Sequence, residues 1–142
     1  MNASSSNTPA GRASTDAAAT VTRLLQELSA LIARKATAQE VLTHLYWPDV
    51  VVAGEGFGQA VHGVENLRPL AVEYLQQMGT DCSFVPSEPV LVSGDLASSF
   101  VQVTCRYHGA QPDAHYCALY VWQRRGADWK VAHEQVCQGS IG

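Results

Sequence analysis

The sequence is short of charged residues, of basic clusters and of long apolar runs. Charged residues make up 15% of the 142 positions, which is low for a small monomer and favours burial of surface in a dimer. The nine Lys and Arg residues are scattered and the net charge is −4, so the basic surface of a nucleic-acid-binding protein is missing. No stretch could span a bilayer, and the N-terminus lacks the apolar run of a signal peptide. We therefore expect no nucleic-acid or membrane partner, and a cytoplasmic location by default.

Signatures of cofactor and nucleophile chemistry are also absent. The sequence has no phosphate-binding loop, no dinucleotide fingerprint and no Ser/His/Asp arrangement. His108 and His115 flank a loop with Asp113, but no HxH or HxxxH spacing would hold them rigidly around a metal. We predict neither a metal nor another cofactor.

The four cysteines have none of the spacings of a zinc site. Cys82, Cys105, Cys117 and Cys137 form no CxxC, so we interpret them as reduced thiols packed like small apolar residues. Cys105 and Cys117 could lie opposite each other on an outer sheet face. A disulfide between them would fit such a pairing but is disfavoured in a reducing compartment.

Hydrophobic residues make up 46% of the chain, enough for the core of one domain. Residues 1–15 are rich in Ser, Ala and Asn without apolar periodicity, which predicts a disordered tail. Residues 16–142 then form a single domain.

Apolar periodicity predicts three helices and six strands in the order ααββαββββ, an α+β fold. Helices are expected from Asp16 to about Ala33, from Thr37 to Pro48, and from Gly63 to Gly79. The expected strands are 49–53, 59–62, a bent edge strand 82–92, and three long strands at 97–108, 114–125 and 128–138.

Hairpin symmetry predicts how the three long strands pair. A two-residue turn at Gly126-Ala127 sets Trp122 opposite Val131 and Tyr120 opposite His133, and a symmetric 109–113 loop sets Thr104 opposite Ala118. One face is then aromatic and polar, and the other is small and apolar. We expect the mixed face to line a pocket and the apolar face to meet a second subunit. A one-residue bulge would exchange part of this assignment.

Several short motifs, in this order, resemble the nuclear transport factor 2-like superfamily over roughly residues 16–139. They are Asp49-Val50-Val51-Val52 after a helix ending in Leu45-Tyr46, and the helix entry Val61-His62-Gly63-Val64-Glu65-Asn66-Leu67-Arg68. The ending Val121 to Arg125 and Trp129 to His133 looks especially like the association domain of calcium/calmodulin-dependent protein kinase II and the SnoaL-like proteins. The resemblance implies a cystatin-like cone, a curved sheet around a long helix. It does not fix an activity.

The functional residues of these relatives do not carry over. The base position of ketosteroid isomerase-like members falls at Gly54, beside Glu55, and their oxyanion-binding Asp falls near Ala118. Their hydrogen-bonding Tyr falls near residues 27–30, where there is no Tyr. The arginines of the kinase association domain fall at Thr104, Tyr120 and Val136, leaving Arg106 as the obvious cation for a carboxylate ligand.

Two catalytic and eight ligand-binding residues are therefore hypotheses. His133 could be a general base, or a core histidine bonded to Tyr120 or Gln135. Glu55 could act with His62 at the pocket mouth, or both could be solvated. Arg106 could bind a carboxylate, or form a salt bridge with Glu134 or Asp113. The predicted ligand-binding set is Arg106, Tyr120, Thr104, Gln102, Tyr74, Trp47, His62 and Gln135.

Two functions of different class fit these observations. The first is binding of a small apolar or carboxylated molecule in the cone, with cofactor-free isomerase, cyclase or hydrolase chemistry. The second is a non-catalytic dimerisation or assembly module, with a homodimer formed through the outer sheet face.

Overall fold

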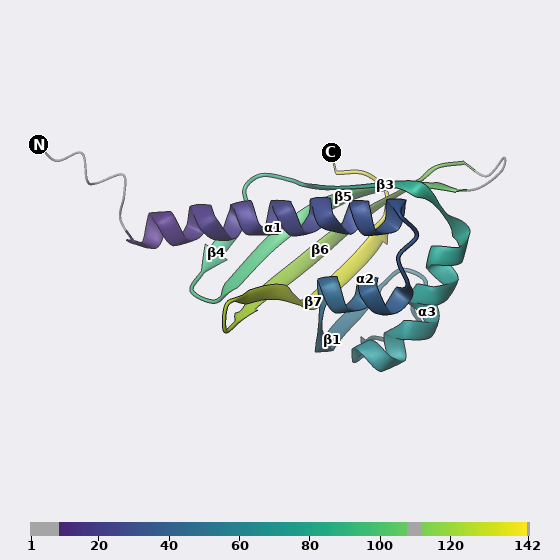
Figure 1. The fold of residues 1–142 in the computed structure, drawn as a ribbon, viewed down its shortest axis with the longest axis horizontal. Helices are drawn as coiled ribbons and strands as arrows, with labels where there is room; N and C mark the ends of the chain where they lie inside the picture. Colours follow the sequence, from purple (N-terminus) through teal and green to yellow (C-terminus); the bar gives the residue numbers. More distant parts are fainter. Residues whose placement is uncertain (1–8, 108–111, 142) are drawn as a thin grey trace, which may run out of the picture.

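The computed structural model describes residues 9–107 and 112–141 (Figure 1). Its helices are α1 (Pro9–Ala33), α2 (Ala38–Leu45) and α3 (Val64–Gln77). Its strands are β1 (Tyr46–Gly54), β2 (Val61–His62), β3 (Met78–Pro86), β4 (Leu91–Ser93), β5 (Leu96–Tyr107), β6 (Ala114–Arg125) and β7 (Asp128–Gln138). The predicted α+β class is confirmed, with one strand more than expected because the bent 82–92 segment divides into β3 and β4. None of the described helices is long and apolar enough to cross a bilayer.

Helix α1 begins earlier than the sequence pattern indicates. Its first residue is Pro9 rather than Asp16, a position where the missing N–H and fixed φ of proline suit a helix. Residues 9–15, expected in the tail, are part of this helix, and residues 1–8 lie outside the described residues. Inside the helix, Val21, Leu25 and Leu28 are buried against the sheet.

The two short helices close one end of the sheet. Helix α2 starts at a capping box, in which the Thr37 hydroxyl accepts the Glu40 N–H and the Glu40 carboxylate accepts the Thr37 N–H. Helix α3 ends at Gln77, and the predicted stop residue Gly79 lies in β3 instead. A Cβ at Gly79 would lie 2.5 Å from the Arg106 carbonyl oxygen, so glycine is needed there for close strand approach.

The strands form one curved sheet in the order β2-β1-β7-β6-β5-β3, with β4 pairing to the other end of β5. The β1–β7 pair is parallel and the other pairs are antiparallel. Figure 1 shows α1 lying along the concave side of the sheet, with α2 beside its C-terminal half and α3 near its C-terminal end. A cone results, whose interior is bounded by the sheet and all three helices.

Two features of strand pairing change the predicted face assignment. Thr104 lies opposite His115 rather than Ala118, an offset of three positions. Successive residues of a strand point to opposite faces, so an odd offset exchanges the two faces of β5 relative to the prediction. Gln102, Thr104 and Arg106 therefore lie on the outer face. The inward residues are Val101, Val103 and Cys105. The predicted Cys105–Cys117 opposition is also wrong, because Cys105 pairs with Ala114.

The second feature is a bulge in β7. Trp122 lies opposite Val131 as predicted, but the next β6 residue, Val121, lies opposite His133. Ala132 is therefore the extra residue, and from His133 onward the faces are exchanged. Glu134 and Val136 turn inward, whereas His133 and Gln135 turn outward.

Candidate functional site

The cone encloses a cavity of about 430 Å³ between the sheet and the helices. Its walls are mostly apolar and come from every helix and most strands. They include Leu28 and Ile32 of α1, Leu42 and Leu45 of α2, Leu67, Leu70 and Leu75 of α3, and Met78, Phe84, Val103, Ala118 and Val136 of the sheet. Concave, largely apolar spaces of this size with a few polar groups are typical ligand sites.

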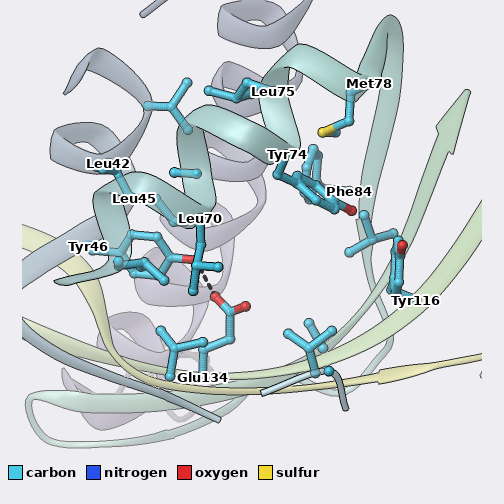
Figure 2. A pocket seen from close by; sticks show the side chains of 18 of the residues that line it. Leu42, Leu45, Tyr46, Leu70, Tyr74, Leu75, Met78, Phe84, Tyr116 and Glu134 are labelled. Atoms are coloured by element: carbon cyan, nitrogen blue, oxygen red, sulfur yellow. Dashed lines mark hydrogen bonds between the residues drawn. The ribbon is translucent and has the colours of Figure 1, made fainter. Parts of the chain in front are cut away.

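One carboxyl group stands on the floor of this cavity. The hydroxyl of Tyr46 donates a hydrogen bond to Oε1 of Glu134 at 2.5 Å, and both side chains line the space (Figure 2). Tyr46 is the first residue of β1 and Glu134 lies on the parallel strand β7, so adjacent strands supply the two partners. The β7 bulge is what directs the Glu134 side chain inward.

Burial gives this carboxyl an unusual pKa. Desolvation disfavours the charged form and raises the pKa of Glu134 from the ordinary 4.5 to about 7, although the hydrogen bond from Tyr46 acts in the opposite direction. Burial, followed by the nearby Glu134 charge, holds the pKa of Tyr46 well above its usual value. Tyr46 thus stays protonated as a donor, while Glu134 can gain or lose a proton near neutral pH.

Tyr120 adds a second hydroxyl to this region. Its ring packs edge-on against Trp122, with ring centroids 5.7 Å apart, and its side chain lines the cavity. Burial raises the pKa of Tyr120, and the Glu134 charge adds to the effect. A neutral phenol beside a carboxyl is suited to polarising an oxygen of a bound molecule.

Tyr74 and Tyr116 form the opposite side of the cavity. Tyr74 of α3 and Tyr116 of β6 have ring centroids 6.2 Å apart, and the Tyr116 hydroxyl is 2.9 Å from that of Tyr107. Figure 2 shows Tyr74 and Phe84 together on this side, separated from the Tyr46–Glu134 pair by the open space. Flat aromatic walls favour a planar or cyclic ligand.

The turn after β1 forms part of the cavity rim. Gly54 has a φ of 147°, and a Cβ there would overlap the carbonyl of Val136. A side chain is thereby excluded from the position where the resemblance would put a catalytic base. Glu55, next in the chain, lines the rim, and its Oε2 accepts the backbone N–H of Gln138 at 3.2 Å.

Three of the ten sequence-predicted site residues line the cavity: Tyr120, Tyr74 and Glu55. His133 and Gln135 lie on the outer face because of the β7 bulge, and Gln102 and Thr104 lie there because of the β5–β6 offset. Gln102 contacts the backbone of Tyr116 and Ile141, and Thr104 contacts His115.

The other three residues lie outside the cavity. Arg106 is exposed, with its guanidinium 3.4 Å from Asp81 and 3.9 Å from Asp113, one of the salt bridges considered from the sequence. Trp47 donates to the Gln123 carbonyl and lies beneath the Arg125 guanidinium. His62 is exposed on β2.

The charged side chains that line the cavity limit the charge of the ligand that it can bind. Its described lining has the carboxyls of Glu55, Glu73 and Glu134, and no Lys, Arg or His. A carboxylated ligand would meet only like charge there. In the part of the chain that the structure describes, no group of three His, Cys, Asp or Glu could hold a metal. His108 of the rejected metal set lies outside the described residues.

Several solved structures share this architecture at low sequence identity. A ketosteroid isomerase-like protein from Erwinia carotovora atroseptica is 20% identical, covering 87% of this chain and 97% of its own, with a TM-score of 0.70. An NTF2-like protein of unknown function from Pseudomonas putida is 17% identical, with 90% and 95% coverage and a TM-score of 0.71. A scytalone dehydratase-like protein from Novosphingobium aromaticivorans is 18% identical, with 84% and 82% coverage and a TM-score of 0.63. No protein-family model and no curated protein sequence matches the chain.

These likenesses define the class of fold. The chain has the nuclear transport factor 2-like, cystatin-like cone fold that the sequence motifs indicated. At these identities the likeness concerns the backbone, so the chemistry must be argued from this chain's own residues.

Proposed function

We propose that the cavity binds a small, uncharged, largely apolar cyclic molecule and that Glu134 transfers a proton to or from it. The observation that carries this proposal is a single carboxyl, with a pKa of about 7, held by a tyrosine on the floor of an apolar cavity. Such a group is divided between acid and base at neutral pH, as general acid–base catalysis requires.

The chemistry fits cofactor-free isomerisation or elimination. As a base, Glu134, oriented by the hydrogen bond from Tyr46, would remove a proton next to a carbonyl group, and the phenol of Tyr120 would donate towards developing negative charge. The names of two structural neighbours, ketosteroid isomerase-like and scytalone dehydratase-like, belong to reactions of this kind. The absence of cations from the described lining favours a neutral ligand over the carboxylated one considered from the sequence.

Proton exchange tests this function directly. A panel of uncharged cyclic ketones beginning with 2-tetralone would be incubated with the protein in D2O, and loss of the proton next to the carbonyl followed by NMR. Glu134→Gln is expected to lower the exchange rate by about 100-fold or more. Tyr46→Phe is expected to move the midpoint of the pH profile upward, because the hydrogen bond that lowers the Glu134 pKa is lost.

Glu55→Gln is the matched control, since this rim carboxyl is exposed, and it should leave exchange unchanged. Exchange no faster than in buffer across the panel would count against proton transfer. So would a Glu134→Gln variant as active as the native chain.

A second function, self-assembly, is favoured by the outer face of the sheet. Ten adjacent outward positions on its three long strands have no Asp, Glu, Lys or Arg: Ser98, Phe100, Gln102 and Thr104 of β5, Cys117, Leu119 and Val121 of β6, and His133, Gln135 and Cys137 of β7. Phe100 is 53% exposed at its centre. We propose that a second copy of the chain covers this face, which would also explain the low charge content.

Light scattering after size exclusion tests the assembly. The native chain is expected to have a dimer mass at micromolar concentration, and Phe100→Lys a monomer mass, because a buried unpaired charge opposes association. Val72→Lys, at an exposed apolar residue of α3, should remain dimeric. A native monomer at that concentration would exclude this interface.

A further inference from the structure

The four cysteines lie in two cross-strand pairs. Cys82 of β3 is directly opposite Cys105 of β5, and Cys117 of β6 is directly opposite Cys137 of β7. Directly opposed residues share a sheet face, so within each pair the two side chains emerge side by side. All four are free thiols in this structure.

The two pairs differ in their place in the hydrogen-bond ladder. Ser87 donates its N–H to the Phe100 carbonyl, one step beyond the Pro86–Val101 pair, so residues 87 and 100 form a hydrogen-bonded pair. Pairs alternate along an antiparallel ladder, which makes Pro86–Val101 non-hydrogen-bonded, as suits a proline. Cys82–Cys105 lies four positions further back on the same ladder, so it is also a non-hydrogen-bonded pair.

The second pair, Cys117–Cys137, is of the other kind. Gly139 donates its N–H to the His115 carbonyl, and Cys117–Cys137 lies two steps along the same ladder. It is thus a hydrogen-bonded pair, with Cα atoms about 5.5 Å apart, against about 4.5 Å and closer side chains in a non-hydrogen-bonded pair. A disulfide needs Cβ atoms about 3.5–4.5 Å apart, so Cys82–Cys105 is the better placed pair.

The surroundings of Cys105 favour its thiolate. Cys105 is fully buried and Cys82 is 6% exposed, and the Tyr74 hydroxyl lies 3.7 Å from the Cys105 sulfur. Hydrogen bonds from Cys82, and then from Tyr74, lower the pKa of Cys105 against the opposing effect of burial. The Cys82 thiol keeps its proton because that hydrogen bond and burial raise its pKa.

We propose that Cys82 and Cys105 form an oxidisable dithiol that a hydroperoxide converts into a cross-strand disulfide. The Cys105 thiolate attacks one peroxide oxygen, the O–O bond breaks, and a sulfenic acid forms as hydroxide leaves. The Cys82 sulfur then attacks the sulfenic sulfur, so that the S–S bond forms and the S–O bond breaks. Two electrons pass from the thiols to one hydrogen peroxide, which becomes two water molecules.

The position of β3 allows the reagent to enter. At Cys82 this strand is the last in the sheet, with a pairing partner on one side only. Local opening of an edge strand needs less free energy than global unfolding and exposes both sulfurs. The disulfide would then link β3 covalently to β5. Strand β3 supplies Met78 and Phe84 to the cavity wall.

Thiol counting after peroxide treatment tests the proposal without any ligand. In the Cys117→Ser/Cys137→Ser double variant, titration with hydrogen peroxide should lower the thiols measured after unfolding from two to none. Chymotryptic peptide mapping should show a Cys82–Cys105 link. Oxidation should raise the Tm by about 5 °C or more, reversed by dithiothreitol, because the cross-link restricts the unfolded chain.

The reciprocal Cys82→Ser/Cys105→Ser variant is the matched control. It should form no intramolecular link at the same peroxide dose. Two remaining thiols in the first variant would overturn the proposal, and so would a sulfinic acid in place of a link. A Cys117–Cys137 link at an equal or lower dose would overturn the ladder argument on which the choice of pair rests.

Discussion

Glu134→Gln is expected to make the protein more stable at pH 8, by about 3 kcal/mol in the free energy of unfolding. Glutamine keeps the shape of the protonated acid and cannot ionise. At that pH the native side chain is ionised inside an apolar cavity, which lowers the free energy of unfolding of the native chain. Stabilisation on removal of a group is the trade-off expected where a destabilising side chain is kept for function.

The sign follows from the two pKa values. The pKa of Glu134 is about 7 in the fold, against an ordinary value of 4.5 for the unfolded chain. Between these values the folded state binds more protons than the unfolded state, so native stability falls as pH rises from about 4.5 to 7 and is level above that. Each pKa unit is worth about 1.4 kcal/mol, which gives the expected difference of about 3 kcal/mol.

Urea unfolding of both chains at pH 4, 6 and 8 measures the effect. The free energies of unfolding of the native chain and of Glu134→Gln should be nearly equal at pH 4. At pH 8 that of the variant should be higher. Glu55→Gln at the exposed rim should follow the native curve throughout. A difference that did not change with pH would mean that Glu134 ionises normally, and the proposed acid–base role would lose its basis.

The fold was accessible from the sequence because its signals are redundant. Apolar periodicity, the Thr37 cap and the strand motif beginning at Asp49 each place an element, and their order defines the cone. Boundary errors arose where one residue has two roles. Gly79 looks like a helix stop, but it is needed where β3 approaches the Arg106 carbonyl.

The site was less accessible because it depends on strand register. Faces in a strand alternate every residue, so one extra residue in β7 was enough to turn His133 outward and Glu134 inward. The sequence contained a signal of this bulge. Val131 and Val136 are both apolar, but an odd spacing of five puts them on opposite faces of a regular strand. In the structure both point inward, Val131 into the core and Val136 into the cavity wall. Requiring both to point inward would have indicated the bulge.

Gly54→Ala is expected to destabilise the fold by about 3 kcal/mol or more. Its φ of 147° is a conformation that L-residues rarely adopt, and a Cβ would overlap the Val136 carbonyl on the neighbouring strand. That carbonyl accepts the Glu55 N–H at 3.1 Å, so relief by strand movement would break this bond and disturb the rim. Thermal and urea unfolding would measure the loss.

The same turn supplies two controls that separate overlap from backbone strain. Gly56 has a φ of 88° with open space around its Cβ position, so Gly56→Ala should cost about 1 kcal/mol from strain alone. Gly58 has open space and no positive φ, so Gly58→Ala should be nearly neutral. Equal losses at the three positions would contradict the overlap with Val136. The expected ranking would instead explain why this chain has no side chain at position 54, after β1. The proposed acid–base group, Glu134, lies on the neighbouring strand β7.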